Sequence, residues 1–209
     1  MKKELKTELT KEKIISAAID EFGCNGYYGS SLNSICDTGI AKGLLYHNFA
    51  NKNAIYLACV QRCFHELTEY LKAADIGTDL QRYASARIDF FMENESMKRI
   101  FFEAVLQPPT VLRIQIDEIR AEFDNYNNEL YLKLLDTVKL RPCVTKKEAL
   151  VYFRLTQEMF NGYFSSQVYP GNAVEEKKSD SNLPQGSFDE HEHMLVKVID
   201  YMLYGIAEK

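Results

Sequence analysis

Apolar residues recur at intervals of three or four along most of this chain, which is the spacing that gathers side chains on one face of an α-helix. The first such segment holds Ile14, Ile15, Ala18, Ile19 and Phe22. Only five prolines and ten glycines interrupt the 209 residues, and 46% of the residues are hydrophobic. A chain of this length can bury a core without disulfides or metal ions. The sequence therefore predicts an all-α protein.

About nine helices are expected, because glycine, proline or polar residues separate the periodic segments. The predicted helices span about residues 10–26, 31–36, 40–49, 52–74, 79–94, 96–106, 108–139, 145–168 and 188–207. Thr10 is a candidate N-cap for the first helix, since its hydroxyl can accept a hydrogen bond from a backbone N–H. Gly26 is expected to end that helix. Residues 169–185 are polar and predict a long loop.

Charged residues are distributed unevenly along the chain. It holds 25 Lys and Arg against 30 Asp and Glu, a formal net charge of −5. Residues 1–55 nevertheless contain seven lysines and only six acidic residues. After Asp37 no acidic residue occurs until Glu66. This asymmetry indicates an N-terminal module that faces an anionic partner, carried on an acidic body.

Residues 37–52 predict a tight turn followed by one short helix. Gly39 can supply the positive φ that a sharp reversal between helices requires. Ile40, Leu45 and Phe49 are spaced to point inward, which leaves a second set of side chains on the outer face. The outward residues are Lys42, Leu44, Tyr46, His47 and Asn48. A short helix with such side chains on a locally basic surface suits entry into the major groove of double-stranded DNA.

Residues 1–60 resemble the DNA-binding domain of the TetR family of bacterial transcriptional regulators. The resemblance rests on Ile15, Ala17, Ala18, Phe22, Gly26, Tyr27, Ser30, Ser31, Ile35, Gly39, Ile40, Lys42, Gly43, Leu45, Tyr46, Phe49, Lys52 and Ile55. It implies a three-helix helix-turn-helix domain over residues 1–52 and a helical effector-binding and dimerisation domain over residues 53–209. Beyond residue 60 the chain is similar to the family in length and helical character.

DNA contacts are expected around the turn and the recognition helix. The candidate residues are Ser31, Lys42, Gly43, Leu44, Tyr46, His47, Asn48 and Lys52. Lys42 and Lys52 can each neutralise a phosphate, and Leu44 can pack on a thymine methyl. Each residue also has a structural alternative, as a solvated lysine, a helix cap or a side chain that packs on its own domain.

Three features depart from the family pattern. The turn between Ile35 and Gly39 is one residue shorter than usual, and one residue corresponds to about 100° of rotation in a helix. Ala41 stands where a serine usually caps the recognition helix, which forgoes about 1 kcal/mol of stabilisation. Asn48 stands where a histidine or tyrosine is common, so a phosphate contact there is expected to differ. Leu44 consequently faces either the DNA or the core.

The family resemblance implies a homodimer. One recognition helix reads too few base pairs, so two must lie about 34 Å, or a multiple of it, apart on the DNA. Apolar stripes on the last two helices suit an isologous four-helix interface. The predicted interface residues are Ala149, Tyr152, Met159 and Tyr163 on one helix and Leu195, Val198, Met202 and Ile206 on the other. Core packing within one subunit is the alternative role for either stripe.

The resemblance also implies a small-molecule effector that releases a repressor from its operator. Aromatic residues of the C-terminal body are candidates to line an apolar cavity for it. The candidates are Phe90, Phe101, Phe102, Phe123, Tyr126, Phe160 and Tyr163. Core packing is the competing role for most of them. If the family mechanism holds, the effector shifts the helix that begins near Lys52 and weakens DNA binding by a few kcal/mol.

Two other functions remain open. Cys59 and Cys63 lie four positions apart with His65 nearby, a spacing compatible with a metal or thiol sensor, although core packing explains it better. His191 and His193 lie among acidic residues, where a solvated helix start is the favoured explanation over a cation site. The second open function is a DNA-binding protein of the same fold whose body binds a protein partner.

The sequence lacks the motifs that are typical of membrane proteins, secreted proteins and enzymes. No segment approaches the roughly 20 apolar residues of a membrane span, and the N-terminus does not resemble a signal peptide, so a cytoplasmic protein is expected. The five cysteines are scattered and odd in number, as is typical of reduced proteins. No catalytic triad, phosphate loop or paired-carboxylate motif stands out. We therefore expect a protein that is not an enzyme and has no cofactor and no metal site.

Overall fold

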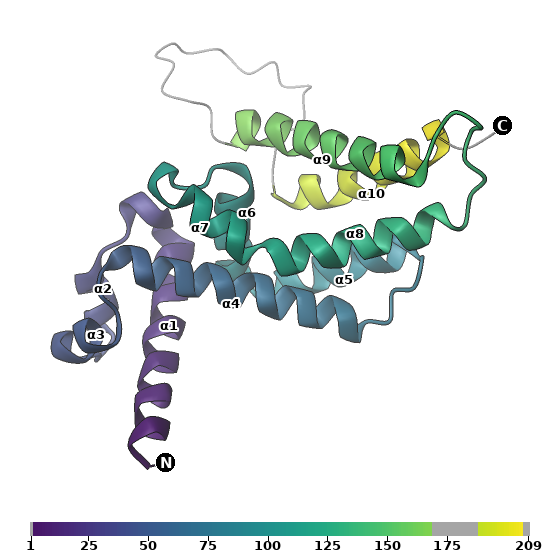
Figure 1. The fold of residues 1–209 in the computed structure, drawn as a ribbon. Helices are drawn as coiled ribbons and strands as arrows, with labels where there is room; N and C mark the ends of the chain where they lie inside the picture. Colours follow the sequence, from purple (N-terminus) through teal and green to yellow (C-terminus); the bar gives the residue numbers. More distant parts are fainter. Residues whose placement is uncertain (1, 169–187, 207–209) are drawn as a thin grey trace, which may run out of the picture. The chain divides into compact units, whose positions relative to one another are not determined.

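A computed structural model describes residues 2–168 and 188–206, with side chains for residues 7–165 and 188–205. Within those ranges the chain forms ten α-helices and one short 3₁₀ helix (Figure 1). The elements are α1 (Lys2–Gly29), α2 (Leu32–Asp37), α3 (Lys42–Asn48), α4 (Lys52–Ala73), α5 (Leu80–Glu93), α6 (Glu95–Leu106), η1 (Thr110–Leu112), α7 (Arg113–Ile119), α8 (Ala121–Leu135), α9 (Lys146–Val168) and α10 (Phe188–Ile206). The predicted all-α class is confirmed.

The first helix begins earlier than predicted. α1 starts at Lys2, so Thr10 lies inside the helix rather than at its N-cap. The backbone leaves the helical conformation at Gly26 (φ 65°, ψ 177°), close to the predicted end. The segment 169–185, predicted as a loop, lies outside the described residues.

The helix predicted over residues 108–139 is wrong as a single element. The chain instead forms η1, α7 and α8, with a break at Arg120 (φ −75°, ψ −5°). Neither glycine nor proline lies at this break, so the local sequence carries no signal of it. No helix among the described residues is long and apolar enough to cross a membrane.

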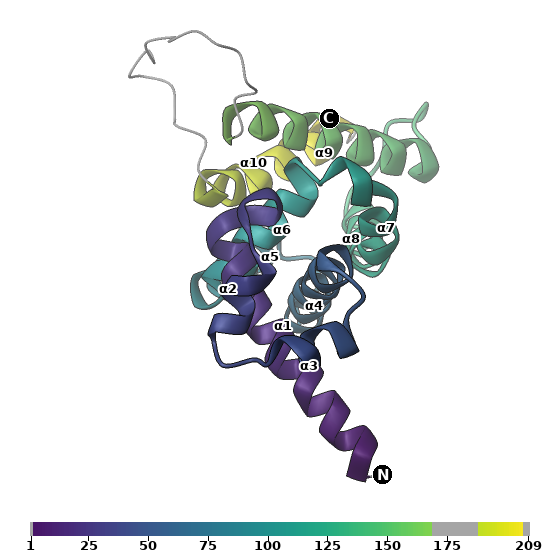
Figure 2. The same cartoon turned by 90° about the vertical axis from the view of Figure 1, so that its left-hand side faces the viewer.

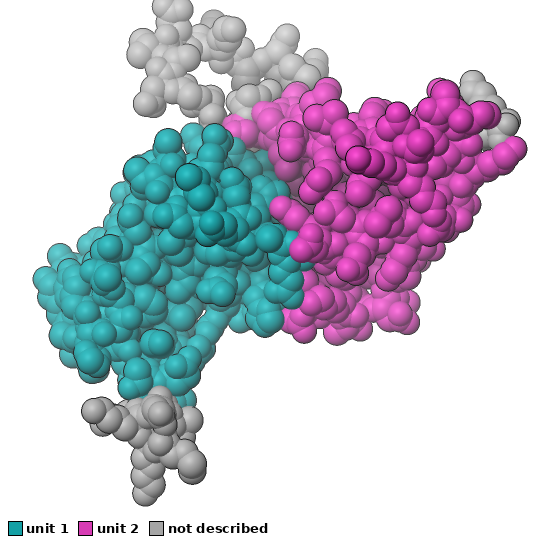
Figure 3. All heavy atoms as spheres, viewed as in Figure 1, with its two compact units in different colours: residues 1–66, 91–122 teal, residues 67–90, 123–209 magenta. Residues whose placement is uncertain are grey.

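The chain divides into two compact units (Figure 3). Unit 1 contains residues 1–66 and 91–122, and unit 2 contains residues 67–90 and 123–209. α4 and α5 therefore each contribute one end to each unit. The boundary predicted after residue 52 separates a DNA-binding part from an effector-binding part, which is a different division from that into compact units. It stays a prediction.

Unit 1 is built around α1, which packs against α2, α3 and α6 (Figure 2). The predicted stripe on α1 forms the core of this unit, since Ile14, Ala18 and Phe22 are each no more than 1% exposed. Ile35 of α2 and Leu45 of α3 are buried to the same degree. Burial of these few large side chains holds the short helices α2 and α3 on α1, because helices of six or seven residues are not stable alone.

A close approach between α1 and α6 depends on Gly23. A Cβ atom added to Gly23 would lie 2.6 Å from the Cα of Ser96 on α6. No side chain fits in that space, so the two backbones pack directly. In unit 2, α9 and α10 pack side by side (Figure 1).

Candidate nucleic-acid interface

A capping hydroxyl begins α2. Ser31 has an extended backbone, and its Oγ accepts a hydrogen bond from the N–H of Asn33 (3.1 Å). The N–H of Ser31 donates to Oε1 of Glu21 on α1 (2.9 Å). A hydroxyl can accept the capping bond and donate its own proton to a phosphate at the same time. Capping therefore leaves the predicted DNA contact of Ser31 possible.

Gly39 forms the turn between α2 and α3. Its φ of 97° confirms the predicted left-handed backbone, which side chains disfavour. The N–H groups of Gly39 and Ile40 both donate to the carbonyl of Cys36, at 3.0 and 3.1 Å. These bonds provide donors for a carbonyl group at the end of α2, and the turn leads directly into α3.

α3 places Leu45 inward and its neighbours outward. Leu45 is fully buried, whereas Leu44 is 48% and Tyr46 is 49% exposed. Leu44 consequently faces outward, so the shortened turn has not rotated it into the core. Ala41 occupies the N-cap and makes no side-chain capping bond, as its methyl group requires.

The outer face of α3 is polar, uncrowded and without a carboxylate. Lys42, Gly43 and His47 are exposed together with Leu44 and Tyr46. Nζ of Lys42 donates to Oδ1 of Asn33 at 3.3 Å, a long bond that a phosphate can replace. No atom lies within 4 Å of the position that a Cβ of Gly43 would occupy. This face can approach an anionic surface closely.

Asn48 has a structural role that the sequence did not reveal. Its Nδ2 donates to the carbonyl of Leu44 at 2.7 Å, which satisfies a carbonyl in the last turn of α3. Its Oδ1 is buried and has no hydrogen-bond partner among the described residues. The predicted contact of Asn48 with DNA stays a prediction.

Lys52 makes contacts within its own domain that the sequence did not reveal. It is partly buried, its Nζ donates to the carbonyl of Ser30 (2.7 Å), and the same atom lies 5.0 Å from the ring centroid of Tyr27. The hydroxyl of Tyr27 donates to Oδ1 of Asn53 at 2.6 Å. An ammonium group has three N–H donors. Lys52 can thus stabilise the start of α4 and still reach a phosphate.

α6 adds a carboxylate to this domain that sequence reasoning missed. Oε1 and Oε2 of Glu103 accept hydrogen bonds from the N–H of Tyr27 at 2.9 and 3.1 Å, and Oε2 also accepts from the hydroxyl of Tyr56 at 2.8 Å. Burial raises the pKa of Glu103, although these hydrogen bonds and the charge of Lys52 oppose the rise. Tyr27 and Glu103 are 76 positions apart, so no local pattern reveals the contact.

The two cysteines proposed as a sensor are buried in unit 1. Sγ of Cys63 donates to the carbonyl of Met97 at 3.1 Å, and Cys59 is fully buried beside Ile15. Burial raises the pKa of the Cys59 thiol to about 12 and also raises that of Cys63. Thiols in this state are poor metal ligands and react slowly. This burial favours the core-packing role of both residues.

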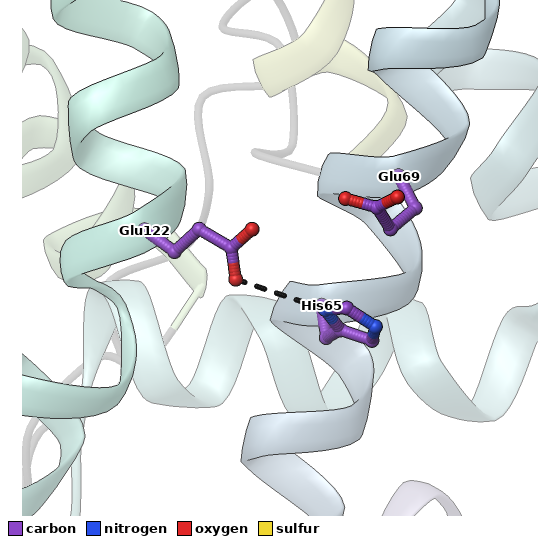
Figure 4. A group of neighbouring side chains, drawn as sticks. All are labelled: His65, Glu69 and Glu122. Carbon is purple, nitrogen blue, oxygen red and sulfur yellow. Dashed lines mark ion pairs between the residues drawn. The ribbon is translucent and has the colours of Figure 1, made fainter.

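His65 points to the surface rather than toward the cysteines. Its Nδ1 lies 3.7 Å from Oε2 of Glu122, and both side chains are exposed (Figure 4). Glu69 follows His65 by one turn of α4. Exposed acidic side chains are common on helices without a bound cation, so we assign no metal site to them.

The predicted effector residues of unit 1 are packed core. Phe101 and Phe102 are 2% and 0% exposed. The ring of Phe101 lies 5.0 Å from that of Phe64 and 5.1 Å from that of Phe91, between centroids. Neither Phe101 nor Phe102 lines the pockets described in either unit. Aromatic packing therefore explains both residues.

The predicted effector residues of unit 2 differ in burial. Phe90, Phe123 and Phe160 are buried, whereas Tyr163 is 48% exposed. Only Tyr126 lines a described pocket, a surface cavity of about 300 Å³ whose other walls include Leu71, Ile76, Lys72 and Glu129. The lining of one apolar cavity by these aromatic residues stays a prediction, and the burial of Phe90, Phe123 and Phe160 favours the competing role in the core.

A buried ion pair in unit 2 was also missed. Nε and Nη2 of Arg87 on α5 donate to the two carboxylate oxygens of Glu192 on α10, at 2.5 and 2.7 Å. Tyr83 donates to Oδ1 of Asn127 at 2.8 Å and accepts from Nη1 of Arg87 at 3.3 Å. All four side chains are no more than 3% exposed. The sequence shows no sign of this pairing, since Arg87 and Glu192 are 105 positions apart.

The two histidines near the start of α10 have different environments. His191 is 3% exposed, contacts Asn161 through Nε2 (3.0 Å) and packs on the ring of Phe160, so a solvated position was the wrong expectation for it. Burial lowers its pKa. His193 is exposed, as expected, and its Nδ1 lies 2.7 Å from the carbonyl of Asp189.

The stripe predicted for dimerisation mixes buried and exposed residues. Ala149, Leu195 and Met202 are no more than 4% exposed, which favours the alternative role of core packing within unit 2 for these three, while the predicted interface stays a prediction. Val198 is partly exposed, and the side chain of Ile206 lies outside the described residues. The exposed apolar residues of α9 are Val151, Tyr152, Leu155, Met159 and Tyr163, and those of α10 are Tyr201 and Tyr204. We call these seven residues the α9–α10 apolar face.

Comparison with known proteins identifies the N-terminal domain. The family model described as bacterial regulatory proteins, tetR family, matches residues 14–59, which contain most of α1, all of α2 and α3, and the start of α4. This part of the chain is a TetR-family DNA-binding domain. The resemblance inferred from the sequence is confirmed, and the TetR match contains every predicted DNA contact residue.

Curated relatives match part of the chain. The negative regulator IcaR of the icaADBC biofilm operon of Staphylococcus epidermidis is 39% identical over 62 residues, which cover 29% of this chain and 34% of IcaR. The transcriptional activator FasR of Mycolicibacterium smegmatis is 27% identical over 112 residues, or 50% of this chain and 51% of FasR. The chain thus spans only about a third to a half of the length of these relatives.

Solved structures share the fold over almost the whole chain. FadR of Bacillus subtilis, solved in complex with stearoyl-CoA, has a TM-score of 0.62 and 17% identity, covering 93% of this chain and 98% of FadR. FadR of Bacillus halodurans, a fatty acid degradation regulator, has a TM-score of 0.60 at the same identity and coverage. At this identity the likeness shows the TetR-family fold alone.

Proposed function

We propose that this TetR-family protein is a homodimeric transcriptional repressor that binds a pseudo-palindromic operator and leaves it when a small-molecule effector binds. The observation that carries the proposal is the outer face of α3, where exposed Lys42, Leu44, Tyr46 and His47 surround Gly43 and no carboxylate is present. The major groove is about 12 Å wide and admits one helix with such side chains. Binding of a chromosomal operator would place the protein in the cytoplasm.

Dimerisation is supported by the α9–α10 apolar face. Met159 is 73% exposed and Tyr201 is 70% exposed, and further apolar residues flank them. Exposed apolar side chains grouped on two packed helices are typical of an interaction site. A second copy of the same chain fits, because an isologous contact lets the same face serve both partners. Two copies would present two α3 helices to two half-sites.

For the effector we propose a chemical class. A structural neighbour, FadR of B. subtilis, was solved with stearoyl-CoA, and its fold is shared by this chain. The C-terminal body here is rich in buried aromatic residues such as Phe90, Phe123 and Phe160. Apolar surroundings of this kind favour an effector with a substantial apolar part. The division into a DNA-binding part up to residue 52 and an effector part beyond it belongs to this proposal.

Selection from a random duplex library tests the proposed function. We expect the wild-type protein to enrich a pseudo-palindromic duplex, and Lys42→Ala and Tyr46→Phe to bind it more weakly. If Lys42 contacts a phosphate, its removal lowers the slope of log affinity against log salt by about 1. Fluorescence anisotropy of the selected duplex over a range of salt concentrations measures both effects.

A matched control separates this contact from general charge loss. Lys133 is an exposed lysine of α8, so Lys133→Ala removes the same charge at a site far along the chain from α3. We expect its affinity and salt slope to equal those of the wild type. Equal losses for Lys42→Ala and Lys133→Ala, or no enriched duplex at all, would contradict the proposed interface.

A further inference from the structure

The break in α1 exposes a backbone donor that α6 satisfies. Gly26 leaves the helical conformation, so the helical hydrogen-bond pattern is interrupted at the next residue. The N–H of Tyr27 donates instead to both oxygens of Glu103, at 2.9 and 3.1 Å. A Cβ at Gly26 would lie 3.0 Å from Oε1 of Glu103. Glycine at this position therefore allows both the turn and the approach of the carboxylate.

The same carboxylate also binds α4. The hydroxyl of Tyr56 donates to Oε2 of Glu103 at 2.8 Å, and Tyr56 is fully buried. The ring of Tyr56 makes edge contacts with Phe22 and Tyr27, with 5.0 Å between centroids in each case. Glu103 thus joins three elements of unit 1, namely α6, the end of α1 and the second turn of α4.

Further contacts continue from Tyr27 to the proposed DNA-binding face. The ammonium of Lys52 lies 5.0 Å above the Tyr27 ring and donates to the carbonyl of Ser30 at 2.7 Å. The next residue, Ser31, caps α2. The conformation of residues 26–31 therefore determines where α2 and, through Gly39, α3 begin.

We propose that Glu103 is a positioning residue for DNA recognition, which holds the start of the helix-turn-helix on α6. This inference rests on the proposed DNA-binding function. Without the carboxylate, the N–H of Tyr27 and the buried hydroxyl of Tyr56 both lose their acceptor, which is costly inside a protein. The end of α1 then gains freedom, and α3 loses the fixed orientation that base recognition requires.

Glu103 follows two aromatic residues of α6 that pack on α5. Phe101 and Phe102 precede it directly, and their rings pack on Phe91, with centroids 5.1 and 5.6 Å away. A shift of α6 that disturbs this aromatic packing also moves Glu103. The hydrogen bonds to Tyr27 and Tyr56 would then lengthen, because a carboxylate bond weakens steeply beyond about 3.2 Å.

The test compares specific with non-specific DNA binding. The proteins are the full-length wild type, Glu103→Ala, Glu103→Gln, Tyr56→Phe and the control Ser96→Ala. Ser96 also links α6 to α1, since its Oγ donates to Oδ1 of Asp20 at 3.3 Å, but it lies seven positions before Glu103 on α6. Each protein is titrated against the duplex selected by the wild type and against a scrambled duplex of equal length, below its melting temperature.

We expect Glu103→Ala to weaken binding to the selected duplex by about tenfold, because two donors, the N–H of Tyr27 and the hydroxyl of Tyr56, lose their carboxylate acceptor. Glu103→Gln keeps one acceptor and should lose less. Tyr56→Phe should resemble Glu103→Gln. Binding to the scrambled duplex should not change, because phosphate contacts do not depend on the orientation of α3. Ser96→Ala should behave like the wild type.

Two results would overturn the inference. One is unchanged affinity of the Glu103 and Tyr56 variants for the selected duplex. The other is an equal loss for Ser96→Ala, since that would show only general weakening between α1 and α6. If Glu103→Ala does not fold, Glu103→Gln and Tyr56→Phe decide the matter. Failure of the wild type to select any duplex is a distinct outcome, which refutes the DNA-binding function itself and this inference with it.

Discussion

Gly23 and Gly43 are both helical glycines, but a methyl group would have opposite consequences at the two positions. At Gly23 it would lie 2.6 Å from the backbone of Ser96, which cannot move without shifting α6. At Gly43 it would meet no atom within 4 Å. Gly23 thus permits close helix packing, whereas Gly43 leaves the surface of α3 open.

We predict that Gly23→Ala lowers the free energy of unfolding by about 1–3 kcal/mol, because the methyl group forces α1 and α6 apart. Gly43→Ala should raise it by up to about 1 kcal/mol, because alanine favours a helix. Urea denaturation followed by circular dichroism measures both. A destabilised Gly43→Ala protein, or an unaffected Gly23→Ala protein, would contradict the packing described for these helices.

α9 and α10 each turn one face toward the core of unit 2 and leave the other face exposed. On α9, Phe153, Phe160 and Phe164 are buried, whereas Leu155 and Met159 are exposed. On α10 the buried apolar residues are Leu195, Val196, Ile199, Met202 and Leu203. The exposed apolar residues of α10, Tyr201 and Tyr204, lie outside the stripe that the sequence predicted.

If the protein forms the proposed dimer, we predict that Met159→Asp converts it to a monomer, because a buried unpaired carboxylate costs several kcal/mol at an apolar interface. Met92→Asp is the matched control, since Met92 of α5 is 75% exposed and Met159 is 73% exposed. Sedimentation velocity at micromolar concentration distinguishes the species. A Met159→Asp protein that remains dimeric, or a Met92→Asp protein that dissociates, would exclude the α9–α10 apolar face as the interface.

At the scale of the whole molecule, one buried ion pair links distant parts of the chain. Arg87 and Glu192 join α5 to α10 within unit 2. Burial raises the pKa of Glu192, but the charge and hydrogen bonds of Arg87 outweigh it and lower the pKa to about 2. The native state therefore holds the carboxylate ionised at pH values where the unfolded chain is already protonated.

This lowered pKa predicts a loss of stability in acid. The contribution of Glu192 is fully present above about pH 5 and falls as the pH decreases toward 2, because the unfolded state then binds the proton more readily. Glu192→Gln should destabilise the protein by about 3–5 kcal/mol at neutral pH, since Arg87 is left buried without its partner charge. Urea denaturation at several pH values measures both effects.

An exposed pair supplies the control for this prediction. Lys146 and Asp136 also form an ion pair in unit 2, but their side chains are 55% and 62% exposed. Asp136→Asn should cost less than about 1 kcal/mol, because water screens surface charges. Comparable losses for Glu192→Gln and Asp136→Asn would show that the buried pair adds no special stability.

The sequence by itself determined the helical class, the turn at Gly39 and the identity of the domain that contains α3. These features depend on residues close together in the chain, since helical periodicity and glycine conformation act locally. It also separated Leu45 from the outward residues of α3, although the direction of Leu44 required the structure.

Only the tertiary structure decided which side chains meet across long separations. Glu103 accepts from Tyr27, Arg87 pairs with Glu192, and Leu195 turns inward rather than outward. The break at Arg120 likewise has no glycine or proline to mark it in the sequence. Such contacts carry no local signature, because the free energy of burial and ion pairing depends on neighbours that folding brings together from distant parts of the sequence.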